Sequence, residues 1–141
     1  MILMAPAMAQ KIDFSMMESM KPRLIGPANM SGRITSIDVV RSSPEIIYAG
    51  SASGGLWKST SGGIDWEPIF DDNLALSIGA VAVSQKNPSV VWAGTGEGNP
   101  RNSLTGGYGI YRSLDAGQTW QLMGLEKTRN IHRIIIHPDD P

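Results

Sequence analysis

The sequence predicts an all-β fold made of repeated sheets, and three observations support this prediction. Glycine and proline are abundant, at 16 and 9 residues, which suits short strands joined by tight turns. Residues 81–94 repeat the pattern of residues 37–50 at an offset of 44, and Trp66 and Trp120 lie 54 residues apart. A period of this size is typical of β-propeller blades. We therefore predict a β-propeller fragment with two four-stranded blades and the start of a third.

Each blade is predicted from apolar runs that are separated by turn residues. The expected strands of the two copies are 34–40, 46–50, 56–59 and 65–70, then 81–83, 90–94, 108–113 and 119–122. An insertion, residues 94–107, raises the offset from 44 to 54 in the second copy. A third copy starts at Arg133, and Pro141 stands in the place of Pro88. The expected blades are therefore about 32–70, 77–125 and a partial 132–141.

A repeat rarely stops in the middle of a unit, so we interpret the chain as part of a larger propeller. Each blade needs neighbours on both faces, and two blades with a fraction of a third cannot close a ring. The remaining blades are therefore the expected partners, and without them the chain should expose apolar faces and associate. The alternative is a complete small β-domain.

The turn after the third strand of each copy carries a shared motif. In the second copy it reads S-x-D-x-G-x-T-W, with Ser113, Asp115, Gly117, Thr119 and Trp120 at the fixed positions. The aspartate can accept hydrogen bonds from backbone N–H groups of its own turn, and the glycine can supply a positive φ. The first copy keeps the serine, glycine and tryptophan but has a serine in place of the aspartate, as Ser59, Ser61, Gly63 and Trp66.

This motif resembles the Asp-box, or bacterial neuraminidase repeat (BNR), of sialidases, sortilin-type receptors and two-propeller xyloglucanases. Residues 25–34, 48–58 and 94–109 further resemble large secreted bacterial propellers labelled sortilin-like or "glycosyl hydrolase, BNR repeat". The resemblance implies a multi-bladed propeller of which this chain forms the first blades. In such proteins the Asp-box is usually a structural turn remote from the active site.

The N-terminus predicts export. Residues 1–9 are apolar and end in Ala7-Met8-Ala9, the pattern of a secretory cleavage site, so we interpret them as a signal-peptide remnant. The alternative is a disordered apolar terminus, and the run is too short to span a bilayer. Residues 10–31 are expected to be a lead-in segment with a short helix and a first strand. The mature protein would then be periplasmic, at the cell surface or secreted.

Composition excludes several classes of function. The net charge is −1, so nothing favours nucleic acid or an anionic membrane surface as a partner. The chain has no cysteine, and its two histidines stand in no metal-ligand spacing, so no metal site is predicted. The glycine pairs at 54–55 and 106–107 precede no helix, which argues against a phosphate site, and no cofactor is expected.

The candidate ligand-binding residues lie mostly on the insertion, because long loops on a rigid scaffold often carry function. They are polar or aromatic side chains that suit a sugar or a peptide: Glu97, Asn99, Arg101, Asn102 and Tyr108, with Arg33 in the first turn. The alternative is that Glu97 and Arg101 pair with each other and hold the loop in shape, because exposed charges on loops are mostly solvated and bind no ligand. The tryptophans could stack on sugars, but Trp66 and Trp120 share one repeat position, which favours packing between blades.

No catalytic constellation is complete in this sequence. The resemblance to the xyloglucanases implies a catalytic aspartate just before a Gly-Gly pair, where this chain has Ala52, and only Glu97 could be half of a carboxylate pair. The arginine triad and tyrosine of the sialidases cannot be placed. We therefore predict a binding or scaffold module for peptide, protein or glycan. The alternatives are part of a glycoside hydrolase whose carboxylates lie mostly elsewhere, and an inert truncated product.

Overall fold

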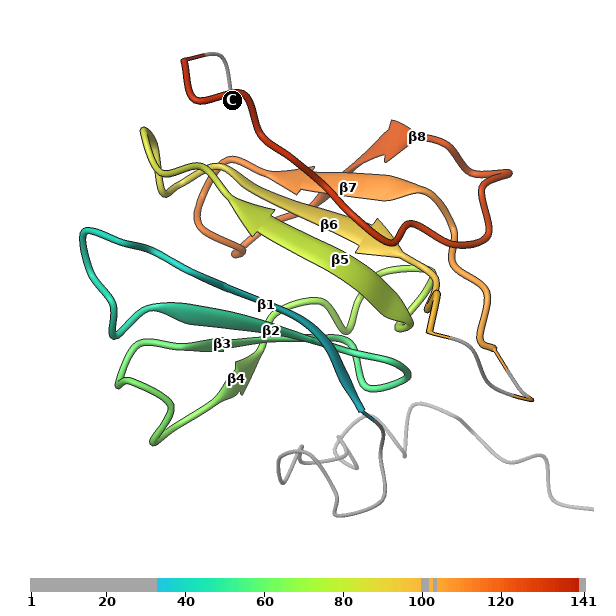
Figure 1. Cartoon of the computed structure of the whole chain (residues 1–141), viewed down its shortest axis with the longest axis horizontal. Coiled ribbons are helices and arrows are strands. Elements are labelled where there is room, and N and C mark those ends of the chain that lie inside the picture. Colours follow the sequence, from blue (N-terminus) through green and yellow to red (C-terminus); the bar gives the residue numbers. More distant parts are fainter. Residues whose placement is uncertain (1–32, 100–101, 103, 140–141) are drawn as a thin grey trace, which may run out of the picture.

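The computed structural model describes residues 33–99, 102 and 104–139, so the predicted signal remnant and lead-in segment lie outside the described residues. The described chain is all-β and forms two antiparallel four-stranded sheets, with strand orders β1-β2-β3-β4 and β5-β6-β7-β8 (Figure 1). Their strands are β1 (Ile34–Val39), β2 (Ile47–Ser51), β3 (Leu56–Ser59), β4 (Glu67–Pro68), β5 (Ile78–Val83), β6 (Val91–Thr95), β7 (Ile110–Ser113) and β8 (Gln121–Gly124). These sheets are the two predicted blades.

The structure differs from the predicted strands at β4, β5, β7 and β8 and at the start of the third copy. β7 and β8 each begin two residues later than predicted. β4 is shorter than the predicted 65–70, because the preceding turn extends through Asp65 and Pro68 has no N–H to continue the ladder. β5 starts at Ile78, three residues before its predicted start, and pairs along its length with β6. Residues 133–137 are not a strand, because no segment of the described chain forms a ladder with them.

The start of the third copy nevertheless occupies the position of a third blade. A Cβ on Gly50 would lie 2.6 Å from Cγ2 of Ile78, and a Cβ on Gly94 would lie 2.5 Å from Cγ2 of Ile131. Gly94 is the repeat equivalent of Gly50, so Ile131 packs on the second blade as Ile78 packs on the first. In Figure 1 the segment after β8 accordingly turns back near the end of β6 and runs over the sheet of the second blade. β5 is buried at all six positions.

Polar side chains of β1 bind the backbone of β5 across the junction between the blades. The N–H of Val81 donates to Ser36 Oγ at 2.9 Å, and the N–H of Val83 donates to Asp38 Oδ2 at 2.7 Å. The Thr35 hydroxyl lies 2.6 Å from the carbonyl oxygen of Ile78. The junction is therefore joined by hydrogen bonds as well as by packing.

Aromatic rings from both blades meet in the core. Phe70, which follows β4, lies edge-on to Tyr111 and to Trp120, with ring centroids 5.1 Å apart in each pair. The indole N–H of Trp120 donates to the carbonyl of Ile69 at 2.6 Å, so Trp120 fills the gap between blades as predicted. The indole N–H of Trp66 instead donates to Gly63 in its own turn.

Apolar side chains on the first blade are exposed, as expected for a blade without a second neighbour. Ile37 on β1 is 61% exposed, whereas its repeat equivalent Val81 on β5 is 6% exposed. Among the described residues, the first blade packs against β5 of the second blade, whereas no sheet packs on the other side of β1 (Figure 1). The exposed face of β1 is thus the apolar face predicted from the repeat pattern.

The turn motif forms the hydrogen bonds that its residues predict. Ser113 Oγ donates to the Asp115 carboxylate and accepts the N–H of Gly117, at 2.7 and 2.8 Å. The Asp115 carboxylate also accepts the N–H and the hydroxyl of Thr119, at 2.8 and 2.6 Å. In the first copy, Ser59 and Ser61 close the same turn through their hydroxyls.

The Asp115 turn should make the stability of the chain sensitive to acid. Hydrogen bonds from Thr119 and Ser113 lower the pKa of Asp115 from 3.8 to about 2. Because the folded pKa lies below the unfolded one, this stabilisation is present above pH 3.8 and is lost as the pH falls toward 2. The stability gap between the wild type and Asp115→Asn, measured by urea unfolding, should therefore narrow over this range. Asp65→Asn, in the equivalent turn, is the control, and a constant gap for Asp115→Asn would contradict the expectation.

Candidate functional site

The candidate residues gather at one end of the two sheets. Because the strands alternate in direction, the β2–β3 loop, the β6–β7 loop and the connections after β4 and β8 all lie at the end where β1 begins (Figure 1). We call this the loop end. The tight turns between β1 and β2, β3 and β4, β5 and β6, and β7 and β8 lie at the opposite end. The long β6–β7 loop is the predicted insertion.

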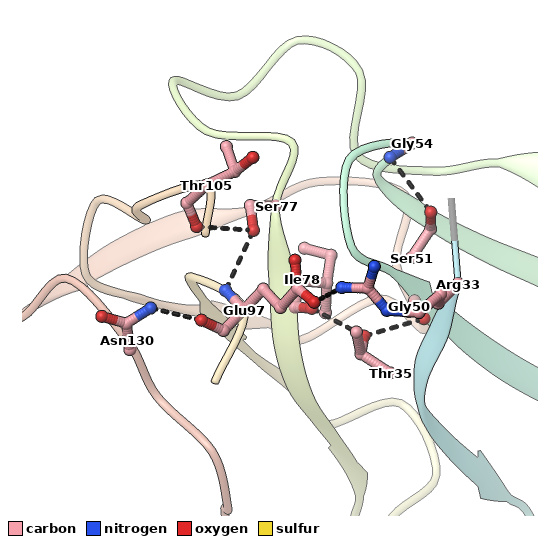
Figure 2. A network of polar contacts seen from close by, with 10 residues as sticks. All are labelled: Arg33, Thr35, Gly50, Ser51, Gly54, Ser77, Ile78, Glu97, Thr105 and Asn130. Carbon is pink, nitrogen blue, oxygen red and sulfur yellow. Dashed lines mark hydrogen bonds and ion pairs between the residues drawn. The ribbon is translucent and has the colours of Figure 1, made fainter. Parts of the chain in front are cut away.

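A buried ion pair lies at the centre of the loop end. Glu97, just after β6, has a side chain that is 2% exposed, and its carboxylate pairs with the guanidinium of Arg33, which is 39% exposed (Figure 2). Arg33 comes directly before β1 on the first blade, so the pair joins both blades. A carboxylate this deeply buried needs such a partner, because an unpaired buried charge is strongly destabilising.

Backbone bonds hold the β6–β7 loop around this pair. The N–H of Glu97 donates to Ser77 Oγ at 3.0 Å, and that hydroxyl donates to the carbonyl of Thr105 at 3.0 Å. Across the base of the loop, Thr95 Oγ1 donates to the carbonyl of Gly109 and accepts the N–H of Tyr108, both at 2.7 Å. The loop is therefore fixed at its base, and Tyr108 is held by its backbone.

The third copy completes the loop from the other side. The Asn130 amide donates to the carbonyl of Glu97 (Figure 2), and the N–H of Gly107 donates to the carbonyl of Arg129 at 2.7 Å. Gly96 has a φ of 89° and approaches Arg129 so closely that a Cβ would overlap the Arg129 carbonyl. The candidate site is thus built by both blades and the start of the third copy.

The structure places the predicted ligand-binding residues in two groups. Asn99 and Asn102 are exposed on the loop, and Tyr108 is 40% exposed at its end. Arg33 and Glu97 form the buried pair, whereas Arg101 lies outside the described residues. Glu97 is not solvated as expected, because Arg33 from the other blade pairs with its carboxylate, and the alternative pairing of Glu97 with Arg101 lies outside the described residues.

Sequence reasoning missed Ser77, Thr105 and Asn130. A signal for two of them was present, since Arg33, Ser77 and Asn130 each stand one residue before the isoleucine that opens a repeat. This position therefore supplies a polar side chain to the loop end in every copy. Thr105 carried no signal, because only its backbone carbonyl takes part.

Among the described residues of the site, the one buried carboxylate is not free to transfer a proton. The Glu97 carboxylate is engaged by Arg33, and Ala52 is buried without an acidic group. Within the described ranges, no three histidine, aspartate or glutamate side chains are grouped so that they could hold a metal ion. The same residues include no helix that is long and apolar enough to cross a membrane.

No family model matches the chain, and no curated protein matches it. Solved structures do match. An ancestral GH74 enzyme is 21% identical with a TM-score of 0.55, over 72% of this chain and 14% of that one. The GH74 enzyme from Niastella koreensis is 22% identical with a TM-score of 0.51, over 65% and 14%. The GH74 xyloglucanase from Xanthomonas campestris is 19% identical with a TM-score of 0.50, over 67% and 15%.

The chain therefore spans only about one seventh of the length of these solved proteins. At these identities the likeness concerns the fold, and it does not carry an activity to this chain. Taken with the two stacked sheets and the seated third copy, it shows that this chain forms two blades of a β-propeller and the start of a third.

Proposed function

We propose that this chain supplies a glycan-binding surface to an exported propeller of glycoside hydrolase type. The proposal rests on one observation above all, an exposed tyrosine, Tyr108, on the same loop as two exposed amides, with the loop held at its base. The fold likeness to GH74 enzymes, one of them a xyloglucanase, supports a polysaccharide over a peptide as the ligand. The Ala7-Met8-Ala9 pattern supports export.

The chemistry of the loop suits a sugar chain. An aromatic ring can pack against the apolar C–H face of a pyranose, and its burial on binding is favourable. The amides of Asn99 and Asn102 each offer two donors and an acceptor, which match the hydroxyl groups of a sugar. Because the backbone of Tyr108 is bonded to Thr95, little ordering is needed when a ligand binds.

The described residues suit recognition better than proton transfer. An inverting glycosidase needs two carboxylates that flank the scissile bond, and each must reach the substrate. Glu97 is buried and paired with Arg33, and Ala52 has no ionisable group. If the whole protein is a hydrolase, its acid and base lie beyond these residues. A propeller that binds a peptide or a protein is the second candidate, because the exposed amides of Asn99 and Asn102 can also pair with a peptide backbone.

The test is binding of the chain to xyloglucan and to mixed-linkage β-glucan, by affinity electrophoresis and calorimetry. Tyr108→Ala should weaken binding about fivefold, because a stacked ring contributes on the order of 1 kcal/mol. Ile64→Ala is the matched control, since Ile64 is 83% exposed on the β3–β4 turn at the opposite end. Equal affinity of the wild type and Tyr108→Ala, or binding to a peptide array but to no glycan, would refute the proposal.

A further inference from the structure

A cation and an aromatic ring on the first blade hold a turn of the second blade. Lys58 Nζ lies 5.6 Å from the ring centroid of Tyr48, on paired positions of β3 and β2. Lys58 Nζ and the Tyr48 hydroxyl both donate to the carbonyl of Ala116, at 2.9 and 3.2 Å. Burial raises the pKa of Tyr48 to about 12, so its hydroxyl stays a donor. Ala116 lies in the β7–β8 turn with a φ of 58°, which points its carbonyl at the first blade.

The second blade carries the same pair at the same positions. Arg112 on β7 pairs in register with Trp92 on β6, and its guanidinium carbon lies 5.5 Å from the Trp92 ring centroid. Within the part of the chain that the structure describes, no turn is bonded to this second pair. Arg112 Nε is buried and has no acceptor among the described residues. A buried N–H without an acceptor is costly, and native structures rarely leave one unpaired.

The start of the third copy lies beside this pair in the arrangement that the second copy adopts on the first blade. Ile131 packs on Gly94 as Ile78 packs on Gly50, and the N–H of Ile131 donates to the carbonyl of Thr95 at 3.1 Å. The segment equivalent to the first strand of a further repeat therefore already packs on the second blade. In the first junction, the element that reaches the cation–aromatic pair is the β7–β8 turn, which follows later in the same repeat.

We propose that Arg112 and Trp92 form a docking site for the turn of a third four-stranded repeat that continues from residues 130–139. Arg112 Nε donates to the backbone carbonyl of the turn residue equivalent to Ala116, the residue before the motif glycine. Trp92 packs beneath the guanidinium, as Tyr48 packs beneath Lys58. This inference concerns how blades recognise each other and does not depend on the ligand of the loop end.

A second copy of the chain is the competing occupant. Its first blade offers Gly62, which stands at the turn position of Ala116 and has a φ of 69°. The N–H of Gly62 donates to Glu45 as that of Ala116 donates to Ser89, so the two turns match. However, β1 of a second copy would have to replace residues 130–137, which already pack on β5 and Gly94. The observations therefore favour a third repeat.

The experiment compares the chain with an extended chain in which a copy of residues 89–125 follows Pro141. The extension should raise the melting temperature, and Arg112→Ala should then lower it by about 4 °C or more. In the unextended chain Arg112→Ala should have less than half that effect. Lys58→Ala is the matched control, because its acceptor Ala116 is present in both chains, so it should destabilise both.

Light scattering on the same samples separates the two occupants. A monomeric unextended chain agrees with the proposal. An unextended chain that dimerises and becomes monomeric in Arg112→Ala would assign the site to a second copy and overturn it. Equal effects of Arg112→Ala in both chains, or an extended chain that fails to fold or gains no stability, would overturn it as well.

Discussion

Replacing Arg33 with methionine should lower the free energy of unfolding by about 3 kcal/mol at pH 7, measured by urea denaturation. The change leaves the Glu97 carboxylate, 2% exposed, without its partner in a site closed by Ser77 and Asn130. Removing one partner of a buried pair is more costly than removing both, since the remaining charge must be desolvated alone. The methylene stem of methionine keeps most of the packing of arginine.

A double-mutant cycle makes this expectation specific. Arg33→Met with Glu97→Met should recover most of the lost stability, because two apolar side chains replace the pair. Glu126→Gln, which removes an exposed carboxylate on the connection after β8, is the control and should change stability by less than about 0.5 kcal/mol. Additive losses in the double variant would show that the two side chains do not act as a pair.

Replacing Phe70 with alanine should cost about 3–4 kcal/mol of unfolding free energy, because it opens a cavity where both blades meet. Phe70 is 1% exposed, and its ring contacts Tyr111 and Trp120 from the second blade. Urea unfolding, monitored by tryptophan fluorescence, measures the loss of unfolding free energy. It should show a single transition in which both blades unfold together.

Phe70→Leu is the matched variant and should cost less than about 1.5 kcal/mol, because it keeps most of the volume. A loss below about 1 kcal/mol for Phe70→Ala would show that the two blades are held by their inner strands alone. A loss of similar size in both variants would show that the edge-on ring contacts, and not the filled volume, stabilise the junction.

The repeat pattern predicted most of the fold, because each copy has its apolar residues and its turn residues at the same positions. Val81 is the repeat equivalent of Ile37, and Trp120 is that of Trp66, so the strands of one blade predicted those of the other. The turn around Asp115 was equally predictable, since its hydrogen bonds form within a few residues of sequence. The length of β4 could not be predicted, because it depends on the residue at which the preceding turn ends.

The candidate site was less predictable than the fold. The insertion and the exposure of Asn99, Asn102 and Tyr108 follow from local composition. The burial of Glu97 depends on Arg33, which lies on the other blade, and on an amide from the third copy. Contacts between repeats are set by how the blades stack, and a single sequence does not display that arrangement.

The hydrogen bonds from Ser36 and Asp38 to β5 have a consequence for the order in which the blades assemble. The two side chains accept hydrogen bonds from alternate residues of β5. A shift of the second blade along the first would therefore leave both side chains without their donors. The equivalent residues on β5 are Ala80 and Ala82, whose side chains cannot accept hydrogen bonds from the backbone of the third copy. The first junction is therefore locked in a single alignment by side chains of its first strand. The second junction is bonded at the loop end instead, through Gly107, Asn130 and Ile131, so hydrogen exchange should find residues 133–137 opening first.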